Sequence, residues 1–275
     1  MAKRYTRAQI IERLRSQIDA GRPLFVPNCG CGLTAKLQEM GGADFICVSP
    51  TSYWRMKGQA SINAFLPHGK PNEAIFELLP EIVAVVQDTP VITLSNPRDP
   101  RLPHREHLEQ LQRFGVSGIN PLMGKSYGPG FNRRLDRYAL GWDAELEFIR
   151  AAREMDMFTF AYAYGPDESC ILAEAGADMI SAHLGQTVGG LVGAESKLTL
   201  DEAVQFSQSI FDAARKVNPE VILLTHGGPL TTPEDVQYVH KRTNADGFVG
   251  GSAAERLPIE KVIIEATESF KNYTR

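Results

Sequence analysis

Cysteine, long apolar runs and excess positive charge are all scarce in this sequence. Four cysteines in 275 residues are too few for a disulfide framework, which indicates a reducing compartment. No stretch approaches the ~18 uncharged apolar residues that a membrane-spanning helix needs. Residues 1–20 are charged throughout and lack the apolar segment of a secretory signal. We therefore expect a cytoplasmic protein without a membrane partner.

The charge balance is slightly acidic. Lysine and arginine together number 29, and aspartate and glutamate 33, which gives a formal net charge of −4. Because nucleic acids are bound by basic surfaces, a nucleic-acid partner is not expected. With 43% hydrophobic and 23% charged residues, the composition is that of an ordinary globular protein and excludes collagen, coiled coils and extensive disorder.

Short apolar runs alternate with amphipathic segments along the whole chain. Several runs follow a phrase such as Gly-Ala-Asp, in which glycine is a common helix stop. Eight runs are expected to be strands, at 23–28, 44–49, 90–95, 116–121, 158–163, 178–183, 220–226 and 245–250. Helices are expected between them, for example at 72–86, 143–155, 199–217 and 232–242. This alternation is typical of parallel strands joined by crossover helices.

Eight strand–helix units in ~250 residues are the content of a TIM barrel. We predict an α/β fold with a single (β/α)8 barrel domain over residues 1–275. Residues 1–22 hold a leading N-terminal helix that covers the floor of the barrel. A doubly wound parallel sheet is the alternative fold.

Two connections are too long to be simple turns. Residues 50–71 follow the second expected strand and residues 122–142 follow the fourth, so both are predicted as long loops over the barrel mouth. Arg55, in the first connection, is a candidate for binding a substrate carboxylate from a lid. The aromatic and basic residues of both connections also suit contacts between subunits, so a homo-oligomer is expected.

Histidine ends two of the expected strands. His183 closes the sixth strand and His226 the seventh, so both are expected to face the same barrel mouth. Because imidazole titrates near neutral pH, either residue could act as a catalytic acid or base. Glu255, shortly after the eighth strand, is a third catalytic candidate that could orient a histidine. The alternative is that each histidine is structural and bonds a neighbouring carbonyl group.

Paired glycines follow the last two expected strands. Gly227 and Gly228 follow the seventh strand, and Gly250 and Gly251 precede Ser252 and an expected helix. Backbone N–H groups in such loops, together with a helix N-terminus, can hold a phosphate or a carboxylate. These residues therefore predict a binding site for a small anionic substrate. The alternative is two tight turns that merely require positive φ angles.

Other polar residues at strand ends complete the predicted substrate site: Asn28, Asn120 and Tyr164. No metal ligand is assigned, because the sequence contains neither an H-x-H nor an H-E-x-x-H motif. A divalent metal is an alternative, bound by the two strand-end histidines with Asp99 or Glu255 in a 2-His-1-carboxylate arrangement.

Ordered motifs along nearly the whole chain resemble those of one known family. They are Asn28-Cys-Gly-Cys-Gly-Leu-Thr-Ala-Lys36, Arg55-Met56, Pro67-His-Gly-Lys-Pro-Asn72, Ala177-Asp178 through His183-Leu-Gly-Gln-Thr-Val-Gly-Gly190, His226-Gly-Gly-Pro229 and Gly250-Gly-Ser-Ala-Ala-Glu-Arg-Leu-Pro258. Together they resemble the phosphoenolpyruvate hydrolase-like family of TIM barrels, which is related to the barrel domain of a plant virus-resistance protein. The family name implies distant kinship with phosphoenolpyruvate mutase and isocitrate lyase, which cleave or rearrange bonds next to a 2-oxoacid.

The sequence departs from these relatives where they carry their chemistry. The acidic cluster that holds magnesium in the mutase and lyase has no matching cluster here, and residues 95–100 and 120–123 differ from the family pattern. We expect a lyase or hydrolase that cleaves a bond next to a carbonyl group in a small anionic or oxygenated substrate. Histidine would move the proton, and backbone amides would stabilise the enolate or oxyanion. The alternative is a non-catalytic ligand-binding or interaction barrel.

Overall fold

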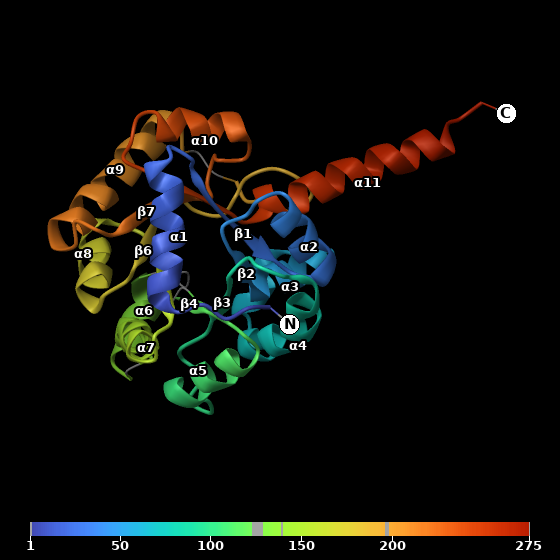
Figure 1. The fold of residues 1–275 in the computed structure, drawn as a ribbon. Coiled ribbons are helices and arrows are strands. Elements are labelled where there is room, and N and C mark those ends of the chain that lie inside the picture. Colours follow the sequence, from blue (N-terminus) through green and yellow to red (C-terminus); the bar gives the residue numbers. More distant parts are fainter. Residues whose placement is uncertain (1, 123–128, 139, 196–197, 275) are drawn as a thin grey trace.

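The computed structural model describes residues 2–122, 129–138, 140–195 and 198–274. Parallel strands form a closed barrel in chain order, and the last strand pairs with the first (Figure 1). The strands are β1 (Leu24–Cys29), β2 (Ile46–Val48), β3 (Val91–Ser95), β4 (Gly118–Pro121), β5 (Phe158–Ala163), β6 (Met179–His183), β7 (Ile222–His226) and β8 (Gly247–Gly250). The predicted (β/α)8 barrel is therefore confirmed, and each expected strand overlaps an observed one.

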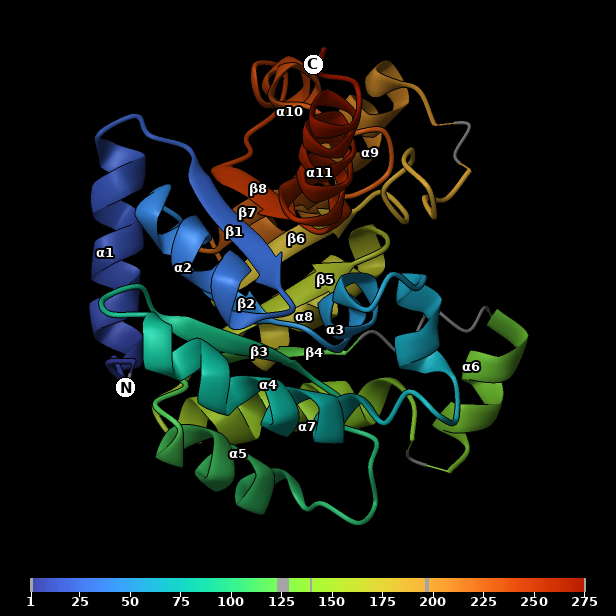
Figure 2. The ribbon, with the colours of Figure 1, turned by 90° about the vertical axis from the view of Figure 1, so that its right-hand side faces the viewer.

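Helices surround the strands as an outer layer (Figure 2). They are α1 (Arg7–Asp19), α2 (Gly32–Met40), α3 (Pro50–Met56), α4 (Pro71–Val85), α5 (His104–Arg113), α6 (Pro129–Asp136), α7 (Trp142–Glu154), α8 (Pro166–Ala175), α9 (Leu200–Val217), α10 (Pro233–His240) and α11 (Arg256–Lys271), with short 3₁₀ helices η1 (Ser61–Phe65) and η3 (Ser252–Ala254). Threonine residues begin several helices through capping boxes, in which side chain and backbone satisfy each other's hydrogen bonds: Thr6 for α1, Thr199 for α9 and Thr232 for α10.

The recurring Gly-Ala-Asp phrase has a structural role at the lower rim of the barrel. Its aspartate stands just before one strand and accepts a hydrogen bond from a backbone N–H near the start of the preceding strand. This is seen for Asp44 with Phe25 at 2.8 Å, Asp178 with Thr159 at 3.0 Å and Asp246 with Leu223 at 2.8 Å. The bond fixes neighbouring strands in register at their amino ends, away from the mouth.

The inside of the barrel is packed with apolar side chains. Val26, Ile92 and Phe160 belong to one buried cluster, and Ile10 and Leu14 of α1 pack into the same cluster. Helix α1 therefore covers the lower opening of the barrel, where its apolar stripe is removed from water. Because the lower half is filled in this way, a ligand site is confined to the upper half, at the carboxyl ends of the strands.

The two connections predicted as long loops contain helices. Residues 50–71 contain α3 and η1, and the first of these begins at once because the Ser49 hydroxyl accepts from the Thr51 N–H and Pro50 favours the first helical turn. Residues 122–142 contain α6, while 123–128 and 139 lie outside the described residues. Both connections thus contain helical structure, which in residues 50–71 begins at a local cap.

Beyond its first turn, the last helix leaves the barrel instead of packing on it. Figure 1 shows α11 extending away from the other helices, with the C-terminal end of the chain beyond it. Its apolar side chains are accordingly exposed: Val262 by 59%, Ile263 by 61% and Phe270 by 81%. Among the described residues, no helix is long and apolar enough to cross a membrane.

Candidate active site

A small cavity of about 110 Å³ lies at the carboxyl ends of the strands. Its polar lining comes from several of them: Asn28 of β1, Tyr162 of β5, His183 of β6 and His226 of β7. Arg55 of α3 closes one side. The barrel topology explains this meeting, since parallel strands that start at one rim must all end at the other.

His183 and His226 are neighbours across the β6–β7 pair. They are register partners, and their ring centroids lie 4.8 Å apart. Tyr162 packs against both rings, with centroid distances of 5.2 Å to His183 and 4.9 Å to His226, and Tyr164 stacks on His183 at 4.5 Å. The two imidazoles are thus held in fixed orientations by aromatic contacts.

Backbone groups assign opposite proton positions to the two rings. His226 Nδ1 lies 2.8 Å from the Val249 carbonyl oxygen, which can only accept, so Nδ1 carries the proton and Nε2 has a free lone pair. The Gly185 N–H, which can only donate, points at His183 Nδ1 at 3.1 Å. In the neutral ring the proton of His183 is therefore on Nε2. One imidazole offers an acceptor and the other a donor.

Burial keeps both rings neutral. Desolvation lowers the pKa of His226 from 6.5 to about 4, although its hydrogen bond to Val249 opposes the shift. Desolvation, together with the nearby His226, lowers the pKa of His183 well below its ordinary value. The complementary proton positions are therefore the ones present at neutral pH.

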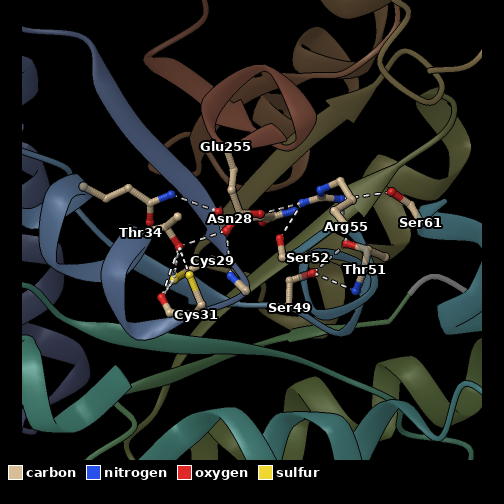
Figure 3. Close-up of polar contacts among 12 residues, drawn as sticks. Asn28, Cys29, Cys31, Thr34, Ser49, Thr51, Ser52, Arg55, Ser61 and Glu255 are labelled. Carbon is tan, nitrogen blue, oxygen red and sulfur yellow. Dashed lines mark hydrogen bonds and ion pairs between the residues drawn. The ribbon is translucent and has the colours of Figure 1, made fainter. Parts of the chain in front are cut away.

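Arg55 is a buried cation with fixed partners (Figure 3). Its Nη1 donates to Thr51 Oγ1 at 3.2 Å and to Ser61 Oγ at 3.0 Å, and its Nη2 donates to Ser52 Oγ. Nη2 also lies 3.5 Å from Glu255 Oε2. Burial lowers the pKa of Arg55, and the adjacent carboxylate opposes that shift. Its Nε has no hydrogen-bond partner among the described residues.

Glu255 bridges two sides of the cavity. In Figure 3 its side chain lies between Arg55 and Thr34, and Oε1 accepts from the Gly30 N–H at 2.7 Å and from Thr34 Oγ1 at 3.0 Å. The described structure gives it no hydrogen bond to a histidine. The suggestion that Glu255 orients a histidine is therefore wrong for this geometry, because the chain after η3 directs its side chain toward β1 and α3. It acts instead as the counter-charge of Arg55.

The four strand-end glycines do not form one anion pocket. Gly228 donates its N–H to the Gly185 carbonyl oxygen at 3.0 Å, so that donor is occupied. Gly227 and Gly228 have φ angles of 76° and 56° and pack on the loop after β6, as the tight-turn alternative requires. Gly250 packs against Phe25 on the outside of the barrel. Of the residues predicted to form this pocket, only Gly251 and Ser252 line the cavity, and Ser252 itself begins the single turn η3.

The remaining predicted residues occupy different positions. Asn28 lines the cavity, and its Oδ1 has no partner in the described part of the chain. Asn120, at the end of β4, is fully buried with neither side-chain atom bonded to a described residue. It is not among the residues that line the cavity. Tyr164 contributes its ring to His183, as described above.

The sequence analysis missed several lining residues. Tyr162 could have been found, because it stands two positions after Phe160 and side chains two apart share one face of a strand. Gln186 and Thr187, which follow β6, also line the cavity. No local pattern shows that this loop folds back over the mouth, so these two residues required the three-dimensional structure.

The described residues do not fit a divalent-metal site. They contain no group of three or more histidine, cysteine, aspartate or glutamate side chains that could hold an ion. Magnesium prefers carboxylate oxygens, whereas the cavity presents imidazoles and the Arg55 guanidinium. Glu255 is engaged as described, and Asp99 pairs with Arg101 at 2.8 Å beside a separate cavity. The alternative of a 2-His-1-carboxylate set is thus not assembled.

The fold and the cavity define a class of protein: a (β/α)8 barrel with a candidate active site of two neutral imidazoles and a buried Arg–Glu pair at the carboxyl ends of its strands. The sequence pattern of the family described as phosphoenolpyruvate hydrolase-like matches residues 9–273. The chain therefore belongs to the phosphoenolpyruvate hydrolase-like family.

Similar proteins agree with this assignment. The ToMV susceptible protein tm-1(GCR26) of Solanum lycopersicum is 37% identical over 269 residues, which are 97% of this chain and 36% of that protein. The chain thus spans just over a third of that relative's length. A phosphoenolpyruvate phosphomutase structure from Streptomyces platensis subsp. rosaceus matches with a TM-score of 0.62 at 16% identity, over 95% of this chain and 88% of that one. A phosphonopyruvate hydrolase complex with oxalate and Mg++ matches with a TM-score of 0.57 at 19% identity, over 94% and 87%. At such identities these structures support the fold alone.

Proposed function

We propose that the chain is a lyase or hydrolase that cleaves a bond next to a carbonyl group in a small anionic substrate. The observation that carries the proposal is the pair of neutral imidazoles with opposite proton positions at one cavity. Acid–base chemistry needs one group that takes a proton and one that donates a hydrogen bond to the oxygen where charge develops. His226 and His183 meet those two needs.

The roles follow from the assigned protons. The Nε2 lone pair of His226 takes a proton from a substrate hydroxyl in a lyase, or from water in a hydrolase. In the lyase case the hydroxyl carbon becomes a carbonyl as the bond breaks, and the electron pair passes to the second fragment as an enolate. The Nε2–H of His183 donates to that enolate oxygen and stabilises the developing charge. This assignment requires no metal and uses only residues that line the cavity.

The cavity favours a substrate of a few heavy atoms. Its volume of about 110 Å³ is well below the ~300 Å³ at the lower end of ordinary ligand pockets. Arg55 supplies positive charge on one wall, where a carboxylate would be attracted. Short 2-oxo and 2-hydroxy carboxylates match both the size and the charge. Oxalate, the ligand in the phosphonopyruvate hydrolase structure, is a dicarboxylate of similar size and serves as a probe.

The proposal is tested by turnover of a panel of short 2-oxo and 2-hydroxy carboxylates, followed by NMR of the products. His226→Gln should abolish turnover of the substrate found, because an amide cannot take the proton. His107→Leu is the matched control: His107 is also buried and its pKa is also lowered to about 4, but it lies on α5 outside the barrel. Full turnover by His226→Gln would refute the assignment. Binding of a panel member without turnover by the wild type would favour the non-catalytic alternative.

We also infer that the chain forms a homodimer through α11. The apolar residues Ile259, Val262, Ile263 and Phe270 recur at helical spacing and form one stripe on this projecting helix. A groove of about 610 Å³ lies outside β1 and β8 beside α10, lined by apolar side chains that include Phe25, Val236 and Phe248. A barrel helix that follows β8 normally covers this region.

Each chain therefore carries both an uncovered helix face and an uncovered groove, and a two-fold exchange of α11 between two copies would bury both. The double variant Val262→Glu/Phe270→Glu should be monomeric by light scattering, whereas wild type should be dimeric. Lys261→Glu, on the opposite side of α11, is the control and should remain dimeric. A monomeric wild type at micromolar concentration would contradict the inference.

A further inference from the structure

One turn of chain supports two walls of the cavity. Glu255 and Arg256 are consecutive, both are buried, and they point to different partners. Glu255 meets Arg55 and the β1 loop, as described above. Arg256, at the start of α11, reaches the loop that follows β6, where its Nη2 donates to the Gly189 carbonyl oxygen at 3.0 Å. The two sides of the site are thus joined through adjacent residues.

Glu260 also takes part in the contact with the loop that follows β6. Arg256 Nη1 pairs with Glu260 Oε1 at 2.8 Å, one helical turn further along α11. The other oxygen of Glu260 accepts from the Leu191 N–H at 3.2 Å. The pair therefore binds a carbonyl oxygen and an N–H group of one short turn, residues 189–191. We call Arg256 and Glu260 the clasp.

In the described part of the chain, little else supports the clasped turn. Gly189 and Gly190 have φ angles of 81° and 72°, which favour glycine, and a Cβ on Gly190 would collide with both members of the clasp. At the neck of the loop, the Ala194 N–H donates to the Thr187 carbonyl oxygen at 3.2 Å. Between this bond and the clasp, no regular secondary structure holds residues 189–193.

The loop that carries this segment lines the cavity. Leu191 is 77% exposed on the outer side, whereas Val192 and Ala194 line the cavity with Gln186 and Thr187. Val192 is the residue of the clasped segment that lines the cavity, so a shift of the turn would open the cavity wall at this point. The position of the turn therefore determines both the access of a substrate and the exclusion of water from the reacting groups.

We propose that Arg256 and Glu260 are positioning residues that hold residues 189–193 as a lid over the substrate. This inference rests on the proposed function, because it assigns the lid to that cavity. The clasp would be released when substrate enters and re-formed when it is bound. Neither residue touches the substrate, so their loss should weaken binding more than the chemical step.

The test combines backbone hydrogen exchange with binding of oxalate as the probe. Glu260→Gln and Arg256→Met should each speed exchange in residues 186–194 about tenfold or more, because a charge-assisted hydrogen bond to the lid is lost or weakened. Gly190→Ala should do the same while both clasp residues remain. Glu265→Gln, an exposed position on the same helix, is the matched control and should exchange as wild type.

Oxalate affinity measured by calorimetry should fall about tenfold in the clasp variants and stay unchanged in the control. With a turnover substrate in hand, KM should rise by a similar factor while kcat changes little. Wild-type exchange in residues 186–194 of all three lid variants would overturn the clasp, even if oxalate still binds. If exchange rises but oxalate binds none of the proteins, the clasp stands and the proposed function loses its support. A dimer mass measured for each variant separates these effects from loss of assembly.

Discussion

The buried pair of Arg55 and Glu255 allows the sharpest quantitative prediction. Glu255→Gln keeps the size of the side chain and an oxygen that can accept from the Gly30 N–H. It removes the only counter-charge that the described structure places beside Arg55, whose guanidinium is buried. The glutamine amide would face Arg55 Nη2 either with its NH2 group, which is also a donor, or with its neutral oxygen. We therefore expect a loss of stability that comes mainly from the uncompensated cation.

The expected size follows from the distance and the burial. At 3.5 Å, with an effective dielectric constant of ~20, Coulomb attraction between two unit charges is about 5 kcal/mol. Removing one member of a buried pair commonly costs about 3–5 kcal/mol, since the other charge stays desolvated. Glu255→Gln should therefore lower the free energy of unfolding by about 3 kcal/mol or more. The double variant Arg55→Met/Glu255→Gln should be more stable than the sum of the single losses predicts.

Urea unfolding followed by circular dichroism measures these differences. The matched control is Glu73→Gln, which breaks the exposed Lys70–Glu73 pair at 2.8 Å and should cost less than about 1 kcal/mol. The charged atoms of the control pair are closer together than those of Arg55 and Glu255. A larger loss of stability for Glu255→Gln would therefore come from burial and not from distance. Additive losses in the double variant, within about 0.5 kcal/mol, would refute the coupling between Arg55 and Glu255.

Three further predictions concern the same structure. A Cβ on Gly30 would lie 2.5 Å from the Ser52 backbone, so Gly30→Ala should displace α3 and destabilise the fold by about 1–3 kcal/mol in urea titrations. Burial lowers the folded-state pKa of His107 to about 4, so the unfolded state binds more protons below pH ~6.5 and stability falls from there toward pH ~4. His107→Leu should remove up to about 3 kcal/mol of this acid sensitivity, and an unchanged pH–stability slope would contradict it. Oxalate should raise the pKa of His226 in NMR titrations, because a nearby anion favours the charged ring.

Much of the fold could be predicted because its determinants are local. Helix stops, capping threonines and apolar runs lie within a few residues of the boundaries that they set, and Asp44 and Asp178 repeat one local device. The direction of α11 could not be predicted in this way. Its apolar stripe shows that the helix needs a partner, but an amphipathic pattern does not identify which surface, or which copy of the chain, supplies it.

The candidate site could likewise be predicted where the sequence signal is local, but not where it depends on contacts between distant residues. Strand-end position placed Asn28, His183 and His226 at one mouth, because parallel topology makes strand ends converge. The glycine-loop prediction was wrong for Gly228 and Gly250, since a glycine pair looks the same in sequence whether its N–H groups are free or bonded across the fold. The partner of Glu255 depends on a contact with a residue 200 positions away in the chain, Arg55, and no local spacing contains that information.

The charges of the cavity explain why neutral histidines suit an anionic substrate. Arg55 and Glu255 offset each other, and both imidazoles are uncharged near neutral pH, so the empty site carries little net charge. A bound carboxylate would then share the positive charge of Arg55 with Glu255 and add one negative charge to the site. It would favour protonation of His226 and raise a pKa that burial and the nearby Arg55 lower to about 4. Since a general base works best with a pKa near the operating pH, the substrate itself would bring the base toward its effective range.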